Sequence, residues 1–158
     1  MKRRWSAIAA AGVGLMALSD TTLERFMALF NETTPDIEAL MSECYASQVL
    51  FRDPLVERRG REGLSQYLAD AYANVTRCEF EYGAPLRSRD QVSIPWTMTL
   101  EHRRLARGAP IHVDGITLLQ GDESGIRFHR DYYDAGQLIY ENVPLLGSVI
   151  RWIRRQAA

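Results

Sequence analysis

Asp53, His129 and Asp131 are the residues of this sequence whose types and positions are best suited to proton transfer. Asp53 stands before Pro54 at the end of a short predicted strand, and His129 and Asp131 stand two residues apart in the last predicted strand. Because side chains alternate across a strand, His129 and Asp131 project from the same face. A carboxylate beside an imidazole can accept a proton from a substrate or orient a water molecule.

Each of these residues also has a structural interpretation. An aspartate before a proline is common in turns, so Asp53 could simply end its strand. Asp131 could form an ion pair with Arg127 or Arg130. A histidine in a strand is more often a hydrogen-bonded structural residue than a catalyst. The residues alone leave both interpretations open.

The elements that must position these residues follow from the spacing of apolar side chains. We expect a helix capped by Thr21 or Thr22, a second helix over about 34–47 that begins at Thr-Pro-Asp, and a third over 61–73. Alternating patterns then predict strands over 49–53, 78–82, 92–101, 111–119 and 126–133. A closing helical region is interrupted near Pro144 and ends in the arginine-rich segment 151–155.

This order of elements predicts an α+β fold with one domain. We expect a cone-shaped, curved antiparallel sheet, three N-terminal helices that enclose a pocket with it, and a C-terminal helix. The formal net charge of −1 lacks the basic excess of nucleic-acid-binding proteins, so we expect no nucleic-acid partner. Cys44 and Cys78 fit neither a disulfide framework nor a zinc motif, so we expect reduced thiols, no metal and no cofactor.

Residues 1–19 differ in composition from the rest of the chain. Three basic residues near the start precede a weakly apolar run over 7–18, which ends in small residues that resemble a cleavage site. The layout is typical of a secretory signal peptide, and the run is too short to span a membrane. Translation from Met16 is the alternative, which we favour. We therefore assign 1–19 to a signal-like or dispensable extension and 20–158 to the domain, and expect a cytoplasmic protein, or an exported one if 1–19 is a signal peptide.

Several motifs resemble the nuclear transport factor 2-like superfamily, in its SnoaL-like branch. Phe-Arg-Asp-Pro at 51–54 resembles the strand that carries the catalytic base of ketosteroid isomerases, and Gly-Arg-Glu-Gly-Leu at 60–64 resembles the opening of their third helix. Arg-Asp-Tyr-Tyr-Asp at 130–134 resembles a segment of limonene epoxide hydrolases whose first aspartate activates water. The stretch 129–155 also resembles a group of bacterial SnoaL-like proteins. The resemblance covers about residues 21–155.

The resemblance implies which face of the last strand lines the pocket. Hydrophobicity alone would turn Phe128 inward. The two enzyme families instead imply that His129, Asp131 and Tyr133 face inward, which leaves Phe128 and Tyr132 on the outer face or at a dimer contact.

On this interpretation Asp53 lies near His129 and Asp131 at one pocket. Apolar walls disfavour the charged form of a carboxyl group, so such a group could act as a general acid or base near neutral pH. The expected substrate-binding residues are Phe26, Phe80, Trp96, Met98, Val113, Thr117 and Tyr133.

The chain departs from both enzyme families at their stabilising groups. Phe26 stands where ketosteroid isomerases have an oxyanion-binding tyrosine, and Gly115 stands where they have a second donor. The arginine and second aspartate of the epoxide hydrolases fall at 96–99, which holds no charged residue. An enolate would lack its stabiliser, which disfavours isomerase activity. Only one acid of the epoxide hydrolase triad is present, as Asp131, which disfavours epoxide hydrolysis.

The resulting hypothesis is a cofactor-free hydrolase, isomerase or cyclase that uses Asp53 or Asp131 as base on a small lipophilic substrate. The alternative is a non-catalytic module of the same fold for ligand binding or dimerisation. By resemblance we expect a homodimer formed through the outer sheet face. We also expect the apolar side of the last helix, with Val149 and Trp152, to dock on the domain rather than on a membrane.

Overall fold

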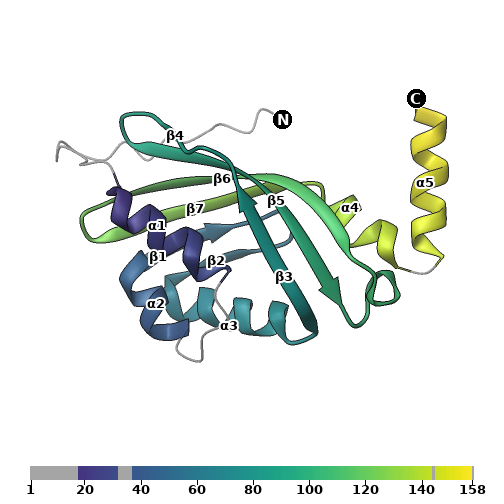
Figure 1. Cartoon of the computed structure of the whole chain (residues 1–158), viewed down its shortest axis with the longest axis horizontal. Coiled ribbons are helices and arrows are strands. Elements are labelled where there is room, and N and C mark those ends of the chain that lie inside the picture. The colour runs from purple at the N-terminus through teal and green to yellow at the C-terminus, as the bar shows by residue number, and fades with distance from the viewer. Residues whose placement is uncertain (1–17, 32–36, 144, 158) are drawn as a thin grey trace.

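The structure is a computed structural model that describes residues 18–31, 37–143 and 145–157. It has the predicted α+β fold. Helices α1 (Asp20–Leu29), α2 (Ile37–Cys44) and α3 (Gly60–Tyr72) lie along one side of a curved sheet (Figure 1). Two α-helices, α4 (Ala135–Leu138) and α5 (Leu146–Ala157), follow the sheet, so the described residues form five α-helices where four were expected.

The sheet has seven strands in the described residues, with the order β2-β1-β7-β6-β5-β3 and with β4 paired to β5. Neighbouring strands are antiparallel except β1 and β7, which pair in parallel. The elements between them in the chain form the crossover connection that a parallel pair requires. The strands are β1 (Tyr45–Arg52), β2 (Glu57–Arg59), β3 (Val75–Tyr82), β4 (Leu86–Arg87), β5 (Gln91–His102), β6 (Ile111–Asp122) and β7 (Gly125–Tyr133).

The long strand β5 follows the alternation of its sequence. Every second side chain is buried and the residues between them are partly exposed, which is the pattern of a strand with one face on the core. The buried residues are Val92, Ile94, Trp96, Met98 and Leu100.

The chain passes from α2 into β1 without a loop. Residues 45–47, which were expected to end the helix, instead begin the strand. Tyr45 is 1% exposed and lies in the main core cluster, so burial of its ring favours the extended conformation here. The expected start of the second helix at 34–36 lies outside the described residues.

Helix α1 is capped by Ser19 rather than by Thr21 or Thr22. The Ser19 hydroxyl oxygen accepts a hydrogen bond from the backbone N–H of Thr22 at 3.1 Å. The preceding Leu18 is 3% exposed and packs in the core. Leu18 and Ser19, which we expected in the N-terminal extension, therefore take part in the fold.

A β-bulge changes which residues of β7 face the interior. Gln120 pairs with Phe128 but the next residue, Gly121, pairs with Ile126, so Arg127 is an extra residue in β7. The bulge lets Ile126 and His129 both be buried although they lie three residues apart. A regular strand would place them on opposite faces.

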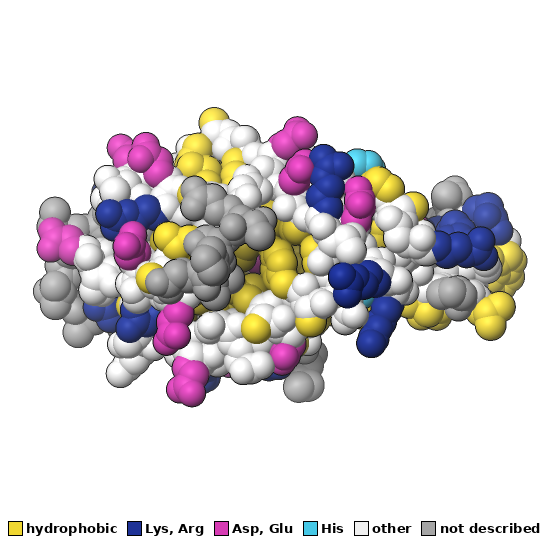
Figure 2. Space-filling view, turned by 60° about the horizontal axis from the view of Figure 1, so that its bottom comes forward, with side chains coloured by type: hydrophobic (Ala, Val, Ile, Leu, Met, Phe, Trp, Pro, Cys, Tyr) yellow, Lys and Arg dark blue, Asp and Glu magenta, His cyan; other side chains and the backbone are white. Residues whose placement is uncertain are grey.

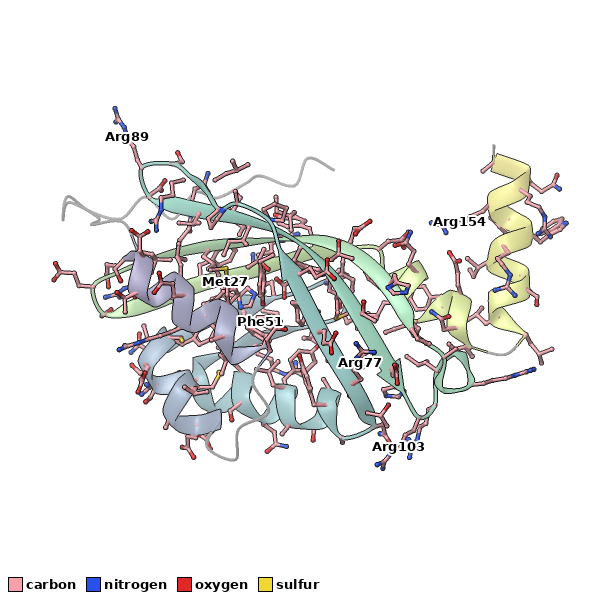
Figure 3. All side chains as sticks on the ribbon, in the orientation of Figure 1. Met27, Phe51, Arg77, Arg89, Arg103 and Arg154 are labelled. Atoms are coloured by element: carbon pink, nitrogen blue, oxygen red, sulfur yellow. The ribbon has the colours of Figure 1, made fainter. Side chains whose placement is uncertain are left out.

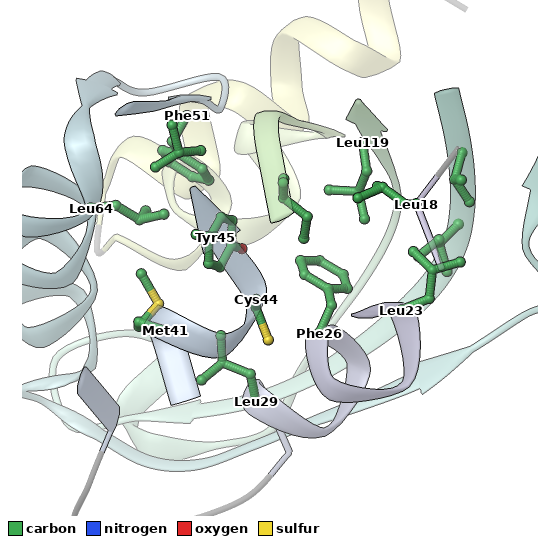
Figure 4. Close-up of a cluster of buried hydrophobic side chains, with 14 of the residues drawn as sticks. Leu18, Leu23, Phe26, Leu29, Met41, Cys44, Tyr45, Phe51, Leu64 and Leu119 are labelled. Atoms are coloured by element: carbon green, nitrogen blue, oxygen red, sulfur yellow. The ribbon is translucent and has the colours of Figure 1, made fainter. Parts of the chain in front are cut away.

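The main hydrophobic core lies between the helices and the sheet. Figure 4 shows residues from α1, α2, β1, α3 and β6 packed together there. Phe51 points into this interior, whereas Arg89 and Arg103 point away from the body (Figure 3). The helices thus close the hollow side of the sheet, which is where the candidate site lies.

The C-terminal helix differs from the expectation. The apolar side of α5 does not dock on the domain, since Val149 and Trp152 are 52% and 56% exposed. Instead α5 meets the 3-10 helix η2 (Tyr140–Asn142) through polar contacts and projects from the body (Figure 1). No helix in the described ranges has the length and apolar content to cross a bilayer.

Candidate functional site

A cavity of about 350 Å³ lies between the sheet and the helices, with residues of α1, α3, β1, β3, β5, β6, β7 and α4 in its walls. Both Asp53 and Asp131 line it. The other side chains around them are mainly aromatic, and include Phe26, Phe30, Phe51, Tyr67, Phe80, Tyr82, Trp96 and Tyr133.

Asp53 is held by four hydrogen-bond donors. Its Oδ1 accepts from the backbone N–H groups of Leu55 and Val56, both at 2.7 Å, which is the turn expected of an aspartate before a proline. Its Oδ2 accepts from the hydroxyl of Tyr67 at 2.6 Å and from that of Tyr133 at 3.3 Å. Both oxygens are therefore engaged by the protein, and Asp53 fixes two tyrosines in the cavity wall.

Asp131 is held through one oxygen only. Its Oδ1 contacts Nε2 of His129 at 2.9 Å and accepts a hydrogen bond from the hydroxyl of Thr117 at 2.5 Å. No described residue bonds its Oδ2. The expected ion pair with arginine is not formed either: Arg127 pairs with Asp122, and Arg130 lies over the ring of Tyr132.

The two donors to Asp131 are themselves oriented by buried groups. Tyr45 Oη lies 2.8 Å from Nδ1 of His129, and Nε1–H of Trp96 donates to the hydroxyl of Thr117 at 2.9 Å. Burial raises the pKa of Tyr45 well above its usual value, so the phenol keeps its proton and can donate to Nδ1. If Nδ1 accepts from Tyr45, Nε2 is the ring nitrogen that carries a proton and donates it to Oδ1 of Asp131.

His129 is fixed further by aromatic contacts. It is 1% exposed, and the rings of Phe26 and Phe51 meet it edge-on at centroid distances of 5.2 and 4.9 Å. The Tyr45 ring stacks on it at 5.9 Å. The imidazole therefore has one orientation, in which Nε2 points at Asp131.

The structure brings most of the predicted site residues to this cavity. His129, Asp131 and Tyr133 of β7 line it, and Phe128 and Tyr132 are not among the lining residues. Val113 is buried in the neighbouring cluster of β5 and β6 and does not line the cavity. The predicted residues in the walls are Asp53, Phe26, Phe80, Trp96, Met98, Thr117, His129, Asp131 and Tyr133.

Four tyrosines of the site were not predicted from the sequence, and one of them, Tyr72, lines the cavity from α3. Tyr45 and Tyr67 were assigned to helix positions, where they gave no sign of bonding His129 and Asp53. Tyr82 lines the cavity, and no described residue bonds its hydroxyl. Burial, and then the charge of Asp131, raise the pKa of Tyr82, so its phenol stays protonated. The alternation of β3 puts Tyr82 on the same face as Phe80, and this sequence pattern could have indicated it.

Gly115 explains how Trp96 fits beside Thr117. The two residues are partners across β5 and β6, and a Cβ atom at Gly115 would lie 2.2 Å from the indole ring. The glycine thus admits the ring that orients Thr117. It contributes no donor to the cavity.

The described residues hold no cluster of three or more metal-ligating side chains. Cys44 and Cys78 are free thiols, and burial raises the pKa of Cys44 to about 11. Such a thiol stays protonated at neutral pH and is a poor nucleophile or ligand.

The sequence matches the family model of the SnoaL-like domain over residues 23–127. That range runs from α1 to the start of β7 and includes Asp53 and Thr117. Among curated proteins the sequence has no significant match.

Solved structures share the fold at low sequence identity. A protein of ketosteroid isomerase-like fold from Catenulispora acidiphila, in complex with trimethylamine, has a TM-score of 0.68 and 20% identity, over 80% of this chain and 96% of that one. A predicted SnoaL-like polyketide cyclase from Jannaschia has a TM-score of 0.68 and 14% sequence identity. The match covers 78% of this chain and 92% of that one. An NTF2-like protein of unknown function from Exiguobacterium has a TM-score of 0.62 and 18% sequence identity. The match covers 72% of this chain and 98% of that one.

Proposed function

The chain belongs to the SnoaL-like family, and we propose that it is a cofactor-free enzyme that moves a proton on a small lipophilic substrate, with Asp131 as general base. The substrate would occupy the cavity beside Asp131, among the aromatic walls. The reaction would be an isomerisation, a cyclisation or the activation of a water molecule.

The asymmetry of the two aspartates carries this proposal. Asp53 uses both oxygens to bind four protein donors, whereas Asp131 uses Oδ1 alone, and no described residue bonds its Oδ2. A base needs a free lone pair within reach of the substrate. Asp131 meets this requirement better than Asp53, whose role is to hold Tyr67 and Tyr133 in place.

His129 acts as a positioning residue. Its Nε2–H and the Thr117 hydroxyl both donate to Oδ1, so they fix the carboxylate plane and stabilise its charge while Oδ2 remains available. This arrangement is preorganised, because Tyr45 and Trp96 hold the two donors before any substrate arrives.

Tyr82 supplies the complementary donor. When Oδ2 of Asp131 removes a proton from the carbon next to a carbonyl group, negative charge develops on the carbonyl oxygen. The protonated Tyr82 hydroxyl can stabilise that oxygen by a hydrogen bond. The proton then returns from Asp131 to another position of the substrate, and no cofactor is consumed.

Exchange of hydrogen for deuterium tests the proposal without knowledge of the natural substrate. A panel of lipophilic cyclic ketones is incubated with the protein in D₂O, and deuterium at the α-carbon is followed by NMR. We expect Asp131→Asn to slow exchange by roughly 100-fold or more, and Tyr82→Phe to slow it less. Asp114→Asn is the matched control, because Asp114 bonds Thr97 and does not line the cavity.

The fold of each variant is checked by circular dichroism and thermal unfolding. Exchange by a folded Asp131→Asn variant at the wild-type rate would refute Asp131 as the base. If Asp53→Asn alone abolished exchange with the fold intact, Asp53 and not Asp131 would be the general base.

A second candidate function is non-catalytic binding of a lipophilic amine. The cavity contains two carboxylates and many aromatic faces, and neither lysine nor arginine lines it, which favours a cation. The similar protein from Catenulispora acidiphila is in complex with trimethylamine. Stabilisation by an alkylamine but not by a neutral hydrocarbon of the same shape, without any ketone exchange, would favour this function.

A further inference from the structure

The C-terminal helix α5 presents an apolar face that no described part of the chain covers. Leu145 is 86% exposed, Val149 52%, Trp152 56% and Ile153 48%. Ten large apolar side chains are exposed in the described ranges, and five of them lie within 145–153. The exposure is therefore concentrated on this helix and on Leu145, the residue before it, rather than spread over the surface, where single apolar residues are common.

The opposite face of α5 attaches it to the body. A Cβ atom at Gly147 would lie 2.1 Å from the Glu141 carbonyl oxygen, and the Arg151 guanidinium donates to the same oxygen at 3.1 Å. Arg154 pairs with Glu141 and, at 2.7 Å, with Asp134 (Figure 3).

This attachment fixes the direction of the apolar face. At 100° per residue, positions 147, 151 and 154 share one side of α5, and positions 149, 152 and 153 share the other. The contacts with Glu141 therefore hold the helix with its apolar face turned away from the domain.

Positive charge surrounds this end of the molecule. The segments 103–108 and 134–157 contain six arginines and two carboxylates, in a chain whose net charge is −1. Both carboxylates pair with Arg154. Figure 2 shows basic and hydrophobic side chains together on the projecting end. The arginines are Arg103, Arg104, Arg107, Arg151, Arg154 and Arg155.

We propose that α5 binds the surface of an anionic phospholipid bilayer. The helix lies in the membrane plane, with its apolar face in the outer part of the acyl region and the flanking arginines at the headgroups. Its 12 residues extend about 18 Å, too short to cross a bilayer. Trp152 is suited to the interface, where tryptophan is enriched in membrane proteins.

A second copy of this chain fits the same face less well. Pairing two α5 faces would bring the arginine-rich ends of two molecules together, and like charges oppose such contact. Anionic lipid instead complements them. The helix also lies beyond residues 23–127, the range matched by the SnoaL-like model.

Vesicle co-sedimentation tests the proposal on the full chain. The vesicles are phosphatidylcholine alone, or phosphatidylcholine with about one third phosphatidylserine, at low and high salt. We expect binding to the anionic vesicles at low salt, weakened by salt and by removal of phosphatidylserine. The double variant Val149→Glu/Trp152→Glu should bind about 100-fold more weakly or not at all. Arg155→Gln should weaken binding about fivefold.

Leu86→Glu is the matched control. Leu86 is 64% exposed on β4, at the end of the molecule opposite α5 (Figure 1), so this variant should bind vesicles like the wild type. Absence of binding to anionic vesicles at low salt would overturn the proposal. So would vesicle binding that survives Val149→Glu/Trp152→Glu, or a lipid-free dimer that this double variant dissociates.

Discussion

Single residues decide which of the two aspartates can act as a base. Both lie in the cavity wall, but Asp53 is enclosed by the turn that follows it and by two tyrosines, whereas Asp131 receives its donors on one oxygen. The difference arises from neighbours supplied by other elements. It therefore depends on the fold and not on the type of residue.

Tyr45→Phe tests the hydrogen bond between the Tyr45 hydroxyl and Nδ1 of His129. The substitution removes the donor to Nδ1 and leaves a buried acceptor without a partner, so we expect a loss of about 1–3 kcal/mol in the free energy of unfolding. Urea denaturation followed by circular dichroism measures it. Tyr140→Phe is the control, since Tyr140 is 43% exposed and should change stability little. Equal effects of the two substitutions would contradict the role given to Tyr45.

The residues of the site were partly predictable from the sequence. The position of Asp53 before Pro54 and the spacing of His129 and Asp131 indicated the acidic groups, and the resemblance indicated their common pocket. The tyrosine donors could not be predicted, because Tyr45 reaches His129 across 84 residues of chain and Tyr67 reaches Asp53 from α3. Such contacts are set by tertiary packing, and the periodicity of a strand or helix does not indicate them.

Among the elements, β7 has the largest influence on the site. Its bulge at Arg127 lets Ile126 fill the core while His129 and Asp131 face the cavity. Alternation alone forces a choice between Phe128 and His129 on the inner face, and for that reason the sequence was ambiguous here. The strands β2 and β4 were missed because two or three residues carry no periodicity.

Gly125→Ala tests the turn that starts β7. Gly125 has a φ of 109°, and an added Cβ atom would lie 2.8 Å from the Cys44 carbonyl oxygen. We expect the substitution to lower the free energy of unfolding by about 1–3 kcal/mol. Gly63→Ala is the matched control, because nothing lies within 4 Å of its added Cβ atom and alanine favours helix α3. A stable Gly125→Ala protein would show that this turn can relax without cost.

The whole molecule should lose stability at alkaline pH. Burial raises the pKa values of Tyr45, Tyr67, Tyr82 and Tyr133 above those of exposed tyrosine. A phenol whose pKa is higher in the folded state than in the unfolded state contributes its full stability below the unfolded pKa of about 10. That contribution is lost as the pH rises above this value. Urea midpoints measured from pH 8 upward should therefore fall above about pH 10. A midpoint that stays constant there would contradict the burial of these phenols.

We also propose that the molecule is a homodimer formed through the outer face of the sheet. Ile116 of β6 is 37% exposed on that face, beside Tyr132 of β7, its cross-strand partner. Light scattering of the wild type should give twice the chain mass of 18.0 kDa, and Ile116→Glu should give a monomer. Ile153→Glu, on α5, should remain dimeric. A monomeric wild type would exclude this assembly.

The protonation of His129 tests the central claim most directly. Ring ¹⁵N–¹H correlation spectra near neutral pH distinguish the two neutral tautomers of the imidazole. We predict that Nε2 carries the proton and that Nδ1 accepts from Tyr45, since an ionised Asp131 can only accept. A ring protonated at Nδ1 and bare at Nε2 would mean that Asp131 donates its own proton to His129, and an aspartic acid in that state could not serve as the base.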